Sequence, residues 1–180
     1  MANYSNDFSI ENLEVIRRYQ SNEDNVFFAY SEFSYNTLIG AYEPFLDIIC
    51  NMHRRFIGGS FDDFQKECGV YYLHRQVLNS YYETGECFRE ETVLLNEVAY
   101  EQRRMTMAIV DMLKRLSEVR PLMIVINRFH MASKSSIETI KYLIDNPCTN
   151  IGIVLGVNAM VKGTDSTVEV WDRIVGGTPG

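Results

Sequence analysis

The chain has 180 residues, of which 46% are hydrophobic and 23% charged, so it is long enough for one folded domain and too apolar to be disordered. Its formal net charge of −7 argues against a broad electrostatic grip on nucleic acid or on anionic lipid. The uncharged apolar runs, Leu122–Ile126 among them, are too short to span a bilayer, and the N-terminus lacks the layout of a signal peptide. We therefore expect a single cytoplasmic domain over residues 1–180, with no nucleic-acid or membrane partner.

Two elements are expected near the start of the chain. Ser9–Tyr19 has apolar residues at a spacing of three to four and a serine suited to cap a helix. Val26–Tyr30 is a short apolar run between polar residues, which indicates a buried strand.

The next part of the chain, approximately residues 38–119, has helical periodicity throughout and is interpreted as a helical insert. Pro44 fits the first turn of a helix, and the apolar face of that helix comprises Phe45, Ile48, Ile49, Met52 and Phe56. Further helices are expected from Ser60, over Tyr71–Tyr82 and over Glu90–Glu118. The last of these is the longest, and its apolar stripe comprises Leu94, Val98, Met105, Ile109, Met112, Leu113 and Leu116.

The pattern then changes to a strand–helix–strand unit. Leu122–Ile126 and Ile151–Val157 are continuous apolar runs, as is typical of parallel strands covered on both faces. Between them, the pair Ser135 and Glu138 has the spacing of a capping box and predicts the start of a helix. The fold class is therefore α/β, with a parallel sheet of about three strands. A short helix over Thr167–Val175 is expected in the tail, and we expect the chain to be a fragment of a longer, multidomain protein.

The four cysteines are far apart in the chain and include no C-x-x-C pair. They are Cys50, Cys68, Cys87 and Cys148. The three histidines do not have the spacing of a metal site either. This pattern is typical of reduced thiols in a cytoplasmic protein, and it predicts no metal ligands.

The segment from Leu122 to Ser136 resembles the Walker B region of the STAND-type AAA ATPases, signalling ATPases that are fused to LuxR-type regulators or to cyclase and GGDEF output domains. In that family an apolar strand leads to two acids, then to a leucine-histidine-tryptophan-alanine stretch and a serine that opens a helix. Phe129-His130-Met131-Ala132 and Ser136 occupy the matching positions. Val26–Phe45 is similar to the family's second strand and the approach to its next helix, and a long helical insert is a family feature as well. The resemblance implies an incomplete, three-layer P-loop-NTPase-like fold.

The chain departs from the family where phosphate chemistry takes place. It contains no G-x-x-x-x-G-K-[ST] loop to hold phosphates. Asn127 replaces the magnesium-binding acid, and an amide is a poor magnesium ligand. Arg128 replaces the catalytic acid, and an arginine cannot act as a general base. We therefore expect no ATP hydrolysis and no cofactor, with ATP and magnesium relevant only if a P-loop lies upstream of Met1.

Four residues are candidates for a remnant nucleotide pocket at the carboxyl end of the strands. They are Asn127, Arg128, His130 and Asn158, the last of which resembles the polar sensor of ATPases. Structural interpretations stay open: Asn127 and Arg128 as exposed residues at a strand end, Asn158 as a turn residue, and His130 as a packed or exposed side chain.

Three functional hypotheses follow. The first is a non-catalytic regulatory or interaction module of a bacterial signalling protein, whose partner is another protein or an output domain of the same protein. The second is a nucleotide-binding ATPase domain with its P-loop outside this chain, or part of a diguanylate cyclase (GGDEF)-type signalling protein. The third is an unrelated α/β enzyme. A two-fold homodimer is also expected, through a sheet edge or the Glu90–Glu118 helix, whose apolar stripe should remain partly uncovered.

Overall fold

The fold is seen in a computed structural model, which describes residues 25–33, 42, 44–85 and 98–157. Three expectations lie outside the described residues: the helix over Ser9–Tyr19, the helix over Thr167–Val175, and the position of Asn158.

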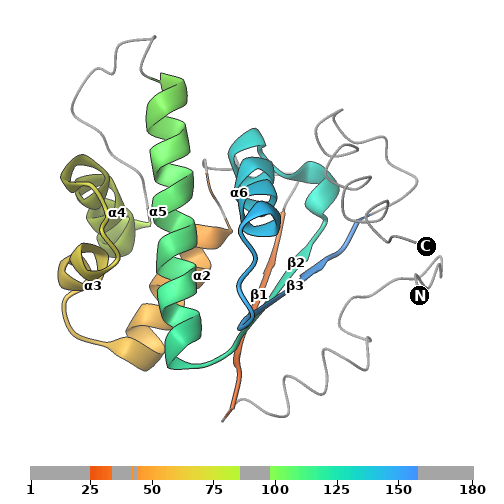
Figure 1. Cartoon of the computed structure of the whole chain (residues 1–180), viewed down its shortest axis with the longest axis horizontal. Coiled ribbons are helices and arrows are strands. Elements are labelled where there is room, and N and C mark those ends of the chain that lie inside the picture. Colours follow the sequence, from red (N-terminus) through yellow and green to blue (C-terminus); the bar gives the residue numbers. More distant parts are fainter. Residues whose placement is uncertain (1–24, 34–41, 43, 86–97, 158–180) are drawn as a thin grey trace.

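The described part contains one sheet of three parallel strands. These are β1 (Phe27–Glu32), β2 (Leu122–Asn127) and β3 (Ile151–Leu155), in the order β1-β2-β3 (Figure 1). The expected parallel pairing of the three runs is therefore confirmed. β1 continues two residues beyond the predicted strand, and β3 ends two residues before it. The chain is thus an α/β protein with β2 at the centre of its described sheet.

The long connection from β1 to β2 is helical wherever it is described, apart from short turns, as the periodicity predicts. It contains α2 (Phe45–Met52), the π-helical turn η2 (His53–Ile57), α3 (Phe61–Glu67), α4 (Tyr72–Thr84) and α5 (Val98–Val119). The connection from β2 to β3 contains the 3-10 turn η3 (Phe129–Met131) and α6 (Lys134–Asp145).

One face of the sheet is covered by helices. Alternate residues of the strands, among them Phe27, Leu122 and Ile124, are buried in one large apolar cluster with side chains of α2, α5 and α6. The strand order follows the chain order, so connections of one hand place their helices on the same face. The other face carries a small cluster around Met123 and Val125. The second helical layer that a three-layer fold requires is not among the described elements.

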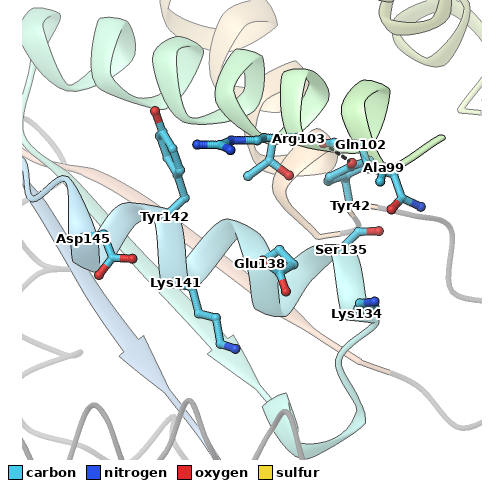
Figure 2. Close-up of a pocket in the computed structure, with 11 residues that line it drawn as sticks. Tyr42, Ala99, Gln102, Arg103, Lys134, Ser135, Glu138, Lys141, Tyr142 and Asp145 are labelled. Atoms are coloured by element: carbon cyan, nitrogen blue, oxygen red, sulfur yellow. Dashed lines mark hydrogen bonds between the residues drawn. The ribbon is translucent and has the colours of Figure 1, made fainter. Parts of the chain in front are cut away.

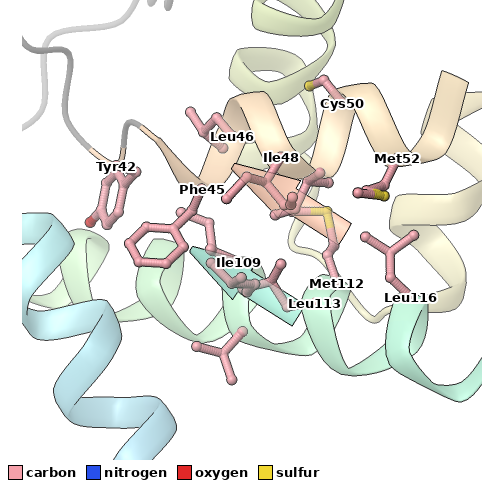
Figure 3. Packing of buried hydrophobic residues seen from close by; sticks show 14 of the residues in the cluster. Tyr42, Phe45, Leu46, Ile48, Cys50, Met52, Ile109, Met112, Leu113 and Leu116 are labelled. Carbon is pink, nitrogen blue, oxygen red and sulfur yellow. The ribbon is translucent and has the colours of Figure 1, made fainter. Parts of the chain in front are cut away.

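Helix α5 is the central support of this core. It contacts both α2 and α6, and Figure 3 shows its apolar side chains facing those of α2. Ile109, Met112, Leu113 and Leu116 are all completely buried. The expectation that this stripe stays partly uncovered is therefore wrong from Ile109 to Leu116, because helices pack on two sides of α5, whereas Met105 is half-buried.

The end of α2 differs from its expected pattern because the helix widens into a π turn. The Gly58 N–H donates to the carbonyl of His53, five residues earlier, at 2.8 Å. The wider turn shifts the helical phase, so that Phe56 is 36% exposed instead of lying with the buried face of α2. Its ring still stacks on that of Phe27, with the centroids 4.5 Å apart.

Helix α6 begins earlier than its predicted capping box. Ser133, and not Ser135, is the N-cap residue, and its Oγ accepts a hydrogen bond from the N–H of Ser136 at 3.2 Å. The predicted box between Ser135 and Glu138 is therefore wrong. The reason lies just upstream: the η3 turn ends at Met131, and two extended residues bring the chain into the helix at Lys134.

Candidate functional site

The first candidate site is the carboxyl edge of the sheet, where open parallel sheets bind ligands. The backbone of β2 is bonded to both neighbouring chain segments at this edge. The Phe33 N–H donates to the carbonyl of Asn127 at 3.2 Å, and the Phe129 N–H donates to that of Gly156 at 2.7 Å. The polar residues that follow β2 therefore start from a fixed backbone.

Asn127 uses its side chain locally. Its Oδ1 accepts a hydrogen bond from the N–H of Arg128 at 2.9 Å, and its Nδ2 lies 3.5 Å from the hydroxyl oxygen of Tyr30. The Tyr30 hydroxyl in turn donates to Glu32 at 3.2 Å. The Asn127 carboxamide thus stabilises the turn after β2 and also contacts Tyr30 of β1.

Arg128 and His130 lie in the turn that follows. Arg128 is exposed and has a left-handed backbone with φ of 54°, which turns the chain sharply at the end of the strand. His130 lies half-buried in η3, and its pKa is lowered, first by burial and then by the positive charge of Arg128. A neutral imidazole is therefore favoured beside a permanent cation.

The structure thus brings together three of the four residues predicted for this site, Asn127, Arg128 and His130, in one turn. It also places Glu32 beside them, because Glu32 is the register partner of Asn127. Sequence reasoning missed Glu32 because the predicted first strand ended at Tyr30. The available signal was the parallel pairing itself, which aligns the ends of neighbouring strands.

The second candidate site is a cleft of about 510 Å³ between α5 and α6. This volume lies in the range of small-molecule sites, which is roughly 300–1,000 Å³. Figure 2 shows its two walls, one from each helix, with charged side chains along them. The lining residues are Tyr42, Ala99, Gln102, Arg103, Thr106, Lys134, Ser135, Glu138, Lys141, Tyr142 and Asp145.

Tyr42 is the buried aromatic side chain of this cleft. Its hydroxyl donates to the carbonyl of Gln102 at 2.8 Å, and burial raises its pKa, with the polar side chains of Thr106 and Ser135 acting in the opposite direction. Its backbone has φ of 72°, an uncommon value for a bulky residue. Such strained positions concentrate at functional sites, so Tyr42 supports the cleft as a site.

The charges of the cleft are mixed in sign. Lys134, Glu138, Lys141 and Asp145 follow one another at spacings of three to four along α6, which places them on one face. Arg103 reaches across from α5, and Figure 2 shows its guanidinium directed toward Tyr142. The described residues that line the cleft include no histidine or cysteine. This arrangement suits the binding of a polar or zwitterionic group by charge and hydrogen bonds.

Other chemically capable side chains are buried in the helical insert, and sequence reasoning assigned them no role. His74 of α4 and Glu101 of α5 share a contact of 2.6 Å between Nε2 and Oε2, largely shielded from solvent. His53 is fully buried among the rings of Phe61 and Tyr82. These groups join helices to one another, so their position indicates a structural role.

The half-buried thiol of Cys68 is a poor nucleophile. Cys50, Cys68 and Cys148 form no disulfide bond within the described residues, and Cys87 is not among those residues. Burial raises the pKa of Cys68 to about 12, so that this thiol stays protonated near neutral pH.

The described histidine, cysteine, aspartate and glutamate side chains include no group of three or more that could hold a metal ion. No helix of the described segments combines the length and the apolarity needed to cross a membrane. Comparison with protein-family profiles, with curated proteins and with solved structures gives no match for this chain.

Proposed function

We propose that this chain is a non-catalytic regulatory and interaction module of a signalling protein, which resembles a degenerate STAND-type AAA ATPase domain. In this proposal the sheet is the remnant of a P-loop-NTPase-like core. The parallel pairing of β1, β2 and β3 supports it, as does the long helical connection between β1 and β2.

The observation that carries the proposal is the use of Asn127. At the position where the resemblance requires a magnesium-binding acid, the carboxamide oxygen is bonded to the backbone N–H of Arg128. The next position holds the cation Arg128 in place of a catalytic acid. The positive charge of Arg128 repels a magnesium ion, and the oxygen of Asn127 already accepts a hydrogen bond. This edge is therefore suited to a structural role and not to phosphoryl transfer.

The proposed module would pass a binding event from the cleft to the sheet. Helix α6 lines the cleft and is joined to the end of β2 by the six residues from Arg128 to Ser133. A protein segment or small ligand bound between α5 and α6 would displace α6. The hydrogen-bonded turn after β2 would transmit that displacement to the edge of the sheet.

One observation favours the second hypothesis, a nucleotide-binding domain with its P-loop outside this chain. Glu32 places a carboxylate next to Asn127 at the edge where the nucleotide would lie. A carboxylate is a ligand that magnesium accepts. Glu32 could therefore replace the missing acid from a neighbouring strand.

Calorimetric titration with Mg·ATP separates the two hypotheses. We expect no saturable heat and no phosphate release from the wild-type chain, because the chain has no phosphate-binding loop and the edge carries Arg128. Binding with a dissociation constant in the micromolar range would overturn the proposal. If that binding is lost in Glu32→Gln and retained in Glu138→Gln, the second hypothesis is favoured.

A further inference from the structure

One side of α5 is exposed and carries an aromatic, an apolar, a basic and an acidic side chain. Relative to Met107, and at about 100° per residue, Tyr100 lies at about 20°, Asp111 at about 40° and Arg104 at about 60° around the helix. We call these four residues the α5 stripe. Tyr100 is 61% exposed and Met107 is 38% exposed, whereas the opposite sides of α5 are buried by α2 and α6.

The two charges of the α5 stripe lack ion-pair partners within the described residues. The Arg104 guanidinium lies over two rings, 4.0 Å from the centroid of Tyr71 and 5.4 Å from that of Tyr100. Asp111 is near Lys114 on its own helix and forms no ion pair with a described residue. An arginine held between tyrosines is a typical anchor of protein interfaces, in which tyrosine, arginine and methionine are enriched.

The stripe is complementary to itself. In two antiparallel copies related by an axis that passes between Met107 and Ala108, Arg104 of one copy lies at the same height as Asp111 of the other. The two are about 5 Å from the axis, measured along the helix at 1.5 Å per residue. The two copies of Met107 meet beside the axis, and Tyr100 lies level with Arg115. An isologous contact therefore forms two identical ion pairs around an apolar centre.

We infer that the α5 stripe binds a second copy of this chain, in an antiparallel, two-fold pairing of the two α5 helices. The charge pattern selects this occupant, because it provides Arg104 and Asp111 each with an opposite charge at the same level. Tyr71 and Tyr72, which begin α4 and are packed edge to face, flank the contact beside Arg104. The interface does not involve Asn127, Arg128 or the cleft, so it is independent of the proposed function.

Sedimentation velocity of the wild-type chain and its charge-reversal variants tests the inference. Between about 10 and 200 µM, where small interfaces associate, the wild type should shift from 20.8 kDa toward twice that mass. Arg104→Asp and Asp111→Arg should each raise the dissociation constant about tenfold or more, because each homodimer then contains two like-charge contacts. An equimolar mixture of the two variants should recover association, because both pairs become complementary again.

Circular dichroism of each variant checks that it is folded, and Glu83→Arg provides a charge reversal of the same size on an exposed residue of α4, outside the stripe. This control should dimerise as the wild type does. The inference is overturned by a wild-type monomer over the whole range, or by folded reversal variants that dimerise normally, which would place the contact on a sheet edge. A mixture that stays monomeric would overturn it as well.

Discussion

The sheet and the helical insert are held by different kinds of contact. Five consecutive residues of β2 are buried, all of them apolar, and their stability comes from the removal of apolar surface from water. The insert shares the large apolar cluster, and buried polar side chains add further contacts between its helices. His53 lies 3.2 Å from the hydroxyl of Tyr82, Gln65 donates to Asn79 at 2.5 Å, and His74 contacts Glu101.

The sheet and the insert should therefore tolerate different kinds of substitution. An apolar layer loses stability when its volume changes, and it is indifferent to protonation. A contact between a buried histidine and a carboxylate depends on geometry, because an unsatisfied buried polar group is costly. The insert is therefore the region in which a small chemical change can loosen one helix from another while the sheet remains intact.

The largest expected effect is in the sheet. Ile124→Ala removes a completely buried side chain from the main cluster and should lower the free energy of unfolding by about 2–5 kcal/mol. Ile153→Ala, on the half-buried β3, is the matched control and should cost less. Urea denaturation measures both, and equal losses would contradict the assignment of β2 as the centre of the core.

A smaller effect is expected at the joint between α4 and α5. In a double-mutant cycle, His74→Gln and Glu101→Gln should each destabilise the chain, with a coupling energy of about 1–3 kcal/mol from the shielded contact of 2.6 Å. The same cycle on Arg115 and Glu118, an exposed pair, should give less than about 1 kcal/mol. A coupling energy near zero at His74 would show that this joint does not hold the helices together.

The cap of α6 should contribute less again. Ser133→Ala removes the oxygen that accepts from the N–H of Ser136 and should lower stability by about 1 kcal/mol. Ser135→Ala should have little effect on the helix, since Ser135 lies beyond the cap. Thermal unfolding of the two variants compares them, and the reverse order would restore the capping box at Ser135.

The last expected effect is a dependence of stability on pH. Burial, together with the charge of Arg54, lowers the pKa of His53 in the folded chain, so the unfolded chain binds protons more readily. Stability is complete above the unfolded pKa of about 6.5 and falls as the pH drops through the lower, folded value. His53→Gln should flatten this slope more than His130→Gln, whose histidine is only half-buried. Denaturation at several pH values that shows no change of slope would contradict the role of His53.

Periodicity and continuous apolar runs predicted most of the elements. β2 was readable because five apolar residues in succession are typical of a strand covered on both faces. α3 was readable from Ser60, which caps it by accepting from the N–H of Asp63 at 3.2 Å, and α4 from the left-handed Gly85 at its end. These signals are local, so a single sequence contains them.

Long-range geometry could not be read in the same way. The sequence near His53 contains no pattern that predicts a π turn, and the exposure of Phe56 follows from that turn. The nearness of Glu32 to Asn127 depends on the register of strands far apart in the chain. The cleft depends on how α5 and α6 pack, which no single segment encodes. The turn residues Asn127, Arg128 and His130 were predictable as neighbours because they are neighbours in sequence.

The strand register has a consequence for how the chain assembles. Phe27 of β1 pairs with Leu122 of β2, 95 positions later, whereas Leu122 pairs with Ile151 only 29 positions further on. Closing the longer loop costs about 1 kcal/mol more in chain entropy than closing the shorter one. The unit of β2, α6 and β3 is thus the more local of the two, and a plausible nucleus on topology alone.

During synthesis the strands appear in a different order from the one in which topology favours their pairing. β1 leaves the ribosome before β2, its pairing partner among the described strands, and β2 follows after roughly 5–20 s at 5–20 residues per second. Its apolar residues Phe27 and Ala29 are exposed over that interval and are open to capture by chaperones. The sheet that the described residues form is complete only when the unit of β2, α6 and β3 has arrived.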